Sequence, residues 1–154
     1  MNIAPASRAT ASNISTVPAT GISSEDIAKF VLRLTLGVLT LLHGINKIET
    51  GPGFVLGLVQ QAGLPSFFAY GVYIGEVIAP LLLIVGLFTR PAALIIVVNM
   101  LVAFALVHSS QLFGLGKQGG WALELQGFFL FTAVVVALLG AGRISVGGIG
   151  GRFN

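Results

Sequence analysis

Four apolar segments, each long enough to cross a bilayer as a helix, most constrain what this chain can fold into. They cover residues about 27–48, 67–88, 91–109 and 121–141. A membrane-spanning helix needs roughly 20 consecutive apolar residues to cross the hydrocarbon core. The pattern therefore predicts an all-α membrane protein built as a bundle of four transmembrane helices.

The composition supports this fold class. Of the 154 residues, 55% are hydrophobic and only 8% are charged, and the mean hydropathy is +0.98. A soluble domain carries about 25% charged residues, so this chain lacks the polar side chains that a water-facing surface needs. The eight Lys and Arg residues are scattered over the apolar segments and form no basic stripe, which argues against a nucleic-acid partner.

The segments outside the spans divide the chain into three parts. Residues 1–25 are rich in Ser, Thr, Ala and Asn and are expected to form a disordered polar tail. Residues 26–146 hold the transmembrane domain, and residues 147–154 form a Gly-rich tail. The amphipathic stretch 54–62, which lies between Gly53 and Gly63, is expected to form a short interfacial helix between the first two spans.

The basic residues predict the orientation of the chain. In a four-span arrangement, both termini and the central loop lie on one side of the membrane, and that side holds six Lys or Arg residues. The other side holds Lys47 and Lys117. Because basic residues concentrate on the cytoplasmic side, we expect both termini in the cytoplasm.

Ionisable residues inside the apolar segments are the candidates for function. A charge at the bilayer centre costs roughly 2.5–3.5 kcal/mol and marks a functional site by default. Two of these residues share one face of the first span because they are four positions apart. With two others near the outer ends of later spans, they are expected to form a polar pocket that opens outward: His43, Lys47, His108 and Glu124.

Two further ionisable residues lie deeper. Glu76 is near the middle of the second span, and Arg33 is about six residues into the first. With a helix rise of about 1.5 Å per residue, their predicted depths differ little, so we predict a buried Arg33–Glu76 ion pair, either structural or functional.

Each candidate also fits a plainer role. Lys47 fits an interfacial anchor whose ammonium group reaches water, and the two histidines and Glu124 fit solvated span ends. Asn99 fits a hydrogen-bonding residue between helices.

Several short motifs follow one another along the apolar segments: Arg33, Gly37, His43-Gly44-x-x-Lys47, Gly75-Glu76, Gly86-Leu-Phe-Thr-Arg90, Glu124 and Gly140-Ala-Gly142-Arg143-Ile-Ser145. In this order they resemble the DoxX family of membrane proteins, including the DoxX/DoxD-like relatives. The resemblance covers about residues 27 to 146. The family ending usually reads Ser-Leu-Asp, whereas here Ser145 is followed by Val146-Gly147.

The resemblance implies a four-helix integral protein of the bacterial inner membrane. Some relatives are linked to quinone-coupled oxidation, as the membrane subunit of thiosulfate:quinone oxidoreductase. Others are linked to membrane oxidoreductase assemblies that handle oxidative stress.

These observations favour a membrane subunit of a quinone-linked oxidoreductase system. A quinone headgroup needs hydrogen-bond donors and a proton path, and its tail needs apolar walls. We assign His43, Lys47 and Glu76 as candidate catalytic residues, and the outer pocket formed by His43, Lys47, His108 and Glu124 as the headgroup site. The sequence contains no cysteine, so electrons are expected from a soluble or membrane oxidoreductase partner or from a diffusible reductant.

Two alternatives remain open, and with them whether the chain is itself catalytic. One is a non-enzymatic scaffold in the bilayer that docks a redox or stress-response partner. The other is a small-solute or proton transporter, which would have to be an oligomer because four helices are few for a pore. No metal site is expected, because the i,i+3 Glu–His pairing of di-iron bundles is absent from the sequence.

Overall fold

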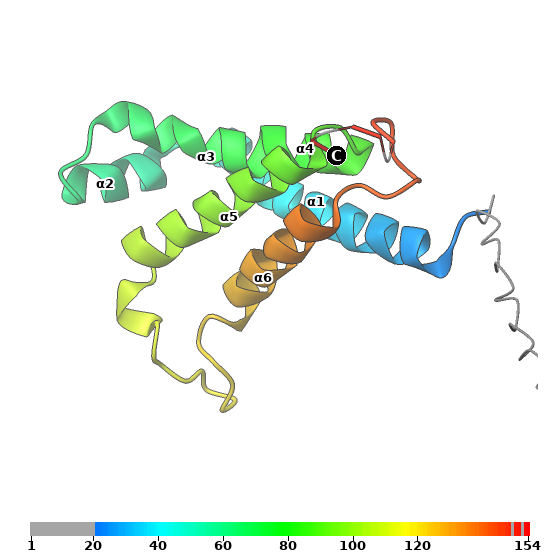
Figure 1. Ribbon diagram of the computed structural model, residues 1–154. Helices are drawn as coiled ribbons and strands as arrows, with labels where there is room; N and C mark the ends of the chain where they lie inside the picture. The colour runs from blue at the N-terminus through cyan, green and yellow to red at the C-terminus, as the bar shows by residue number, and fades with distance from the viewer. Residues whose placement is uncertain (1–20, 149, 152) are drawn as a thin grey trace, which may run out of the picture.

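The computed structural model describes residues 21–148, 150, 151, 153 and 154, and it is all-helical over these residues apart from loops and one isolated bridge between Leu115 and Trp121 (Figure 1). Three helical segments are long and apolar enough to cross a membrane: α1 (Ser24–Thr50), the continuous segment Ser66–Val85, and α5 (Thr89–Leu106). The apolar helix α6 (Glu124–Leu139) is shorter, with 16 residues. The predicted all-α class is confirmed. Of the predicted disordered tail, residues 1–25, residues 1–20 lie outside the described residues, whereas Ser24 and Glu25 already belong to α1.

A short helix, α2 (Gly53–Gln61), follows α1 over most of the stretch 54–62, and its position at the membrane interface stays a prediction. The second apolar segment is a composite: the 3-10 helix η1 (Ser66–Tyr70) leads into α3 (Gly71–Tyr73), the π-helix η2 (Ile74–Ile78) and α4 (Ala79–Val85). It ends three residues before the predicted boundary, because Gly86 adopts a left-handed conformation, with φ +76°, and donates its N–H to Leu82 and Leu83.

The loop between α5 and α6 (Glu124–Leu139) extends further along the chain than predicted. A 3-10 turn, η3 (Ser109–Gln111), follows α5, and α6 begins at Glu124, three residues after the predicted start. Trp121 belongs to the loop, where its indole N–H donates to the Leu112 carbonyl over 2.7 Å. The chain therefore enters α6 from an ordered polar loop.

The helices pack around one apolar core, with α1 against α4 and α5 against α6 (Figure 1). Large apolar side chains also cover the outward faces: Phe128 and Leu138 of α6 are 73% and 71% exposed. An exterior of this kind suits lipid contact rather than water. The core consists of Leu36, Ala79, Leu83, Ala92, Ala93, Ile96, Met100, Phe129, Ala133 and Val136.

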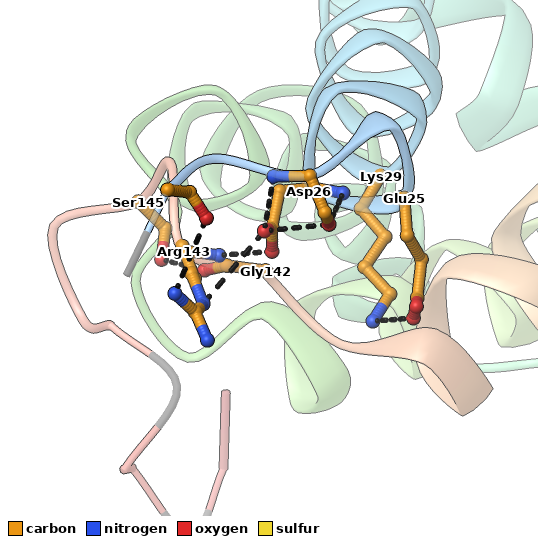
Figure 2. A network of polar contacts seen from close by, with 8 residues as sticks. Glu25, Asp26, Lys29, Gly142, Arg143 and Ser145 are labelled. Atoms are coloured by element: carbon orange, nitrogen blue, oxygen red, sulfur yellow. Dashed lines mark hydrogen bonds and ion pairs between the residues drawn. The ribbon is translucent and has the colours of Figure 1, made fainter. Parts of the chain in front are cut away.

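Asp26 joins the start of α1 to the segment that follows α6 (Figure 2). Its carboxylate accepts hydrogen bonds from the backbone N–H and hydroxyl of Ser23, which form a capping box with it. It also accepts one from the Arg143 N–H over 3.2 Å and forms an ion pair with the guanidinium of that residue. The first and last apolar helices are thus tied together at one end of the bundle.

Arg33 is buried at the carboxyl end of α4, with only 1% of its surface exposed. Its guanidinium donates to the carbonyls of Leu83 and Ile84, and to the Ile144 carbonyl over 2.7 Å. The last carbonyls of a helix have no partner within it and attract cations. Arg33 therefore caps α4 and connects it to α1 and to the carboxyl-terminal segment.

The predicted Arg33–Glu76 ion pair is wrong. Glu76 instead pairs with Lys47, with 2.5 Å between Nζ and Oε2. The reason is the register of α1 against the second segment: the Glu76 main chain packs against Gly44, eleven residues beyond Arg33. At about 1.5 Å per residue, this places Glu76 roughly 16 Å along α1 from Arg33.

The corrected pairing predicts a specific pattern in a double-mutant cycle. Lys47→Met alone leaves the Glu76 carboxylate without its partner, so adding Glu76→Gln should recover about 1 kcal/mol or more of the free energy of unfolding. Arg33→Met and Glu76→Gln should be additive within about 0.5 kcal/mol because the two residues share no contact. Equilibrium unfolding in mixed micelles measures both cycles. The observed register would be contradicted if Arg33→Met and Glu76→Gln were coupled while Lys47→Met and Glu76→Gln were additive.

Candidate functional site

A cavity of about 850 Å³ lies between α1, α2, the Ser66–Val85 segment, α5 and α6. Most of its wall is apolar, with side chains such as Phe54, Val59, Val98 and Phe129. Small-molecule sites have this character: an apolar pocket with a few polar groups that orient the ligand. The polar and charged residues that line it are Thr40, His43, Lys47, Glu76, Asn99, His108 and Gln126.

An ion pair with an attached amide is the main polar feature of this cavity. The Lys47 ammonium contacts Glu76 Oε2 over 2.5 Å, and the Asn99 amide donates to Glu76 Oε1 over 3.4 Å. The Lys47 and Glu76 side chains are 25% and 10% exposed. We call these three residues the Lys47–Glu76–Asn99 group. It joins three helical segments, and its two charges neutralise each other.

Backbone features of the second segment place Glu76. Pro80 has no N–H, so the Glu76 carbonyl lacks its usual helical donor, and the chain forms a π-turn in which the Ala79 N–H donates to the Ile74 carbonyl. The freed Glu76 carbonyl packs against Gly44 of α1, where no Cβ would fit. π-turns of this kind occur often at functional sites.

A second glycine, Gly75, brings Asn99 close to the same turn. A Cβ at Gly75 would lie 2.5 Å from Asn99 Cγ, so only glycine leaves room for the amide. Gly75 therefore leaves space for the Asn99 side chain, and the next residue, Glu76, accepts a hydrogen bond from the Asn99 amide.

His43 lies one turn before Lys47 and faces the same cavity. Its ring packs edge-on against Phe129 of α6, with 5.6 Å between the ring centroids and 86° between the planes. Within the described residues, no hydrogen bond to either ring nitrogen occurs. A ligand in the cavity can therefore use this imidazole as a donor or an acceptor.

His108 lines the cavity where the chain leaves α5. The Gln126 amide nitrogen lies 3.3 Å from His108 Nε2, and Gln111 Oε1 lies 3.2 Å from His108 Nδ1. These two side-chain contacts hold His108 between Gln111 of the loop and Gln126 of α6.

The structure does not bring Glu124 into this cavity. Glu124 lines a separate polar recess of about 410 Å³ together with Lys117, Gln118 and Trp121 of the loop. Because α6 begins at Glu124, its next residues, Leu125 and Gln126, face the cavity and Glu124 faces the loop. Of the predicted headgroup residues, His43, Lys47 and His108 line one cavity, and Gln126 takes the place expected for Glu124.

Three cavity residues were missed or assigned a plainer role from sequence: Thr40, Asn99 and Gln126. Thr40 precedes Lys47 by seven residues, two helical turns, and this spacing on one face was a usable signal. Asn99 was assigned to helix packing, and its contact with Glu76 depends on the π-turn. Within the described residues, no group of three or more His, Asp or Glu side chains is placed to hold a metal ion.

The chain matches known proteins over most of its apolar part. The family model described as DoxX matches residues 28–109, more than half of the chain. An "Uncharacterized protein" of Haemophilus influenzae is 33% identical over 104 residues, which cover 65% of this chain and 76% of that protein.

A second relative is "Putative oxidoreductase CatD" of Bacillus subtilis, 29% identical over 118 residues, which cover 77% of this chain and 83% of that protein. No solved structure matches the chain significantly. The family match confirms the resemblance that the motifs of α1 and the second segment predicted, and the chain belongs to the DoxX family.

Proposed function

We propose that this protein is a membrane subunit of a quinone-linked oxidoreductase system and that its cavity holds a quinone headgroup. The observation that carries the proposal is the Lys47–Glu76–Asn99 group, which places an ion pair and an amide inside a mostly apolar wall. An apolar cavity among lipid-facing helices suits a ligand that resides in the bilayer. The name of the Bacillus relative supports the general class of redox proteins.

The residues present fit a quinone. Quinone oxygens accept hydrogen bonds, and the Lys47 ammonium has three N–H donors, of which Glu76 uses one. The His43 ring offers another donor from the same helix face. A cavity of about 850 Å³ also has room for part of an apolar tail beside the headgroup.

When bound, a quinone supplies two-electron, two-proton redox chemistry. The chain's own residues would bind the headgroup and manage protons: Lys47 donates a hydrogen bond to an oxygen, and Glu76 and His43 hold or pass a proton. The sequence has no cysteine, so we propose that a partner oxidoreductase subunit or a diffusible reductant delivers the electrons.

We further propose that the chain crosses the bacterial inner membrane four times, with α2 in the outer interface and both termini in the cytoplasm. The Asp26–Arg143 contact supports an even number of crossings, because it holds the start of α1 and the segment after α6 at the same end. The excess of basic residues at that end supports its cytoplasmic placement. With 16 residues, α6 is about 24 Å long, shorter than the hydrocarbon core of about 30 Å, so its crossing would need a locally thinner bilayer or flanking residues that complete the span.

Single cysteines test this topology, because the native chain has none. In intact cells with a permeable outer membrane, Lys117→Cys in the loop before α6 should react with a membrane-impermeant maleimide. Val146→Cys after α6, which is 75% exposed, should react only after the inner membrane is opened. Labelling of both positions from the same side would contradict four crossings.

Quinone titration tests the proposed ligand. For the protein in nanodiscs, a quinone at 100 times its Kd should raise the free energy of unfolding by about 2.7 kcal/mol, seen as a higher Tm. Lys47→Met removes a charge-assisted hydrogen bond and should weaken binding by about 10- to 100-fold.

The matched control for this titration is Lys117→Met, because it removes the same charge from the loop recess and leaves the cavity intact. It should bind quinone as tightly as the native protein. A native protein whose Tm no quinone changes would overturn the proposal, as would equal quinone affinities of Lys47→Met and the native protein.

A further inference from the structure

The hydroxyl of Thr40 is a buried polar group with no visible partner. Thr40 is 1% exposed, and its Oγ1 makes no hydrogen bond in the described part of the chain. One other buried side-chain atom there shares this property, Nε of Arg33. Arg33 already donates to three carbonyls and does not line the cavity. Thr40 is one of the residues that line it. Its hydroxyl is itself covered in this structure, so a ligand meets the hydroxyl once the side chain turns about χ1, for which a helical threonine has two favoured positions.

An unpaired buried hydroxyl is costly. Leaving such a group unsatisfied costs about 1–3 kcal/mol, whereas a valine of nearly the same shape would have no such cost. The wall around it also includes Met100 and Phe129, which offer no oxygen or nitrogen acceptor from their side chains. A ligand oxygen or hydroxyl would satisfy Thr40.

The position of Thr40 relative to the ion pair defines the shape of that ligand. Thr40 is four residues before Gly44, against which the Glu76 main chain packs, so it lies about 6 Å further along α1. It is also on the same helix face as Lys47, two turns away. The cavity thus has polar groups at two levels, with apolar wall around them.

The charges of the wall limit the ligand further. Apart from its two histidines, the ionisable residues that line the cavity are Lys47 and Glu76. Their opposite charges neutralise each other in an ion pair. Thr40 is neutral. The cavity therefore favours an uncharged ring with oxygen atoms on opposite edges, rather than an anion or a ring with one polar edge.

We propose that Thr40 is the second anchor of the cavity's ligand: its hydroxyl binds the far oxygen of a 1,4-quinone whose near oxygen meets the Lys47–Glu76–Asn99 group. This inference rests on the proposed quinone function and adds a selectivity to it. Rings with oxygen on two opposite edges use both levels, and rings with oxygen on one edge use only the ion-pair level.

The test compares Thr40→Val, Thr40→Ser and the native protein in nanodiscs, with decylubiquinone and 4-decylphenol as probes. Thr40→Val should weaken decylubiquinone binding about five- to tenfold, the effect of one neutral hydrogen bond, and should leave decylphenol binding unchanged. Thr40→Ser, which keeps the hydroxyl, should bind both probes like the native protein. Thr35→Val, at an exposed position of the same helix, should change neither affinity.

The Tm of the unliganded Thr40→Val variant distinguishes a ligand-binding role of Thr40 from a structural role. If the hydroxyl serves only a ligand, unliganded Thr40→Val should be as stable as the native protein or more stable, because an unsatisfied group is removed. A lower Tm together with equal losses of affinity for both probes would assign Thr40 a structural role and overturn the inference.

Two binding outcomes separate this inference from the proposed function. Equal decylubiquinone affinity of Thr40→Val and the native protein would overturn the role of Thr40 and leave the quinone function standing. A native protein that binds no decylubiquinone would overturn both.

Discussion

At Gly44 the backbone of α1 comes so close to the Glu76 carbonyl that any side chain there would overlap it. This contact sets the register of α1 against the second segment, and the remaining polar contacts follow from it. It places Lys47 beside Glu76, and it places Arg33 level with the last carbonyls of α4. Pro80 makes the contact possible, because its missing N–H frees the Glu76 carbonyl and leads to the π-turn. One glycine and one proline thus determine which charges meet.

The features that depend on one helix at a time were predictable from sequence. His43 and Lys47 share a face because the helical turn fixes positions four residues apart, and both line the cavity. Contacts between helices were less predictable. The partner of Glu76 depends on the π-turn, and the direction of Glu124 depends on α6 starting three residues later than expected. Hydropathy reports which residues are apolar and carries no information on register between helices.

The polar groups of the bundle fall into two sets with different roles. Arg33 and Asp26 hydrogen-bond to main-chain groups and hold the ends of helices and the carboxyl-terminal segment together. Lys47, Glu76 and Asn99 contact one another beside a cavity, with His43 and Thr40 close by in sequence and facing the same space. The first set stabilises the fold. The second set leaves donors and acceptors unused at the cavity wall, which is the property expected of a binding site.

We propose that this cavity holds a membrane-soluble quinone, and the lipids that the protein retains from its own membrane provide the test. Native protein and the Lys47→Met variant would be purified in mild detergent, and their bound lipids extracted and identified by mass spectrometry. We expect quinone to co-purify in amounts approaching one per native chain and to be depleted about tenfold or more in the variant. Native protein that carries no quinone above the level of the surrounding lipid would contradict it.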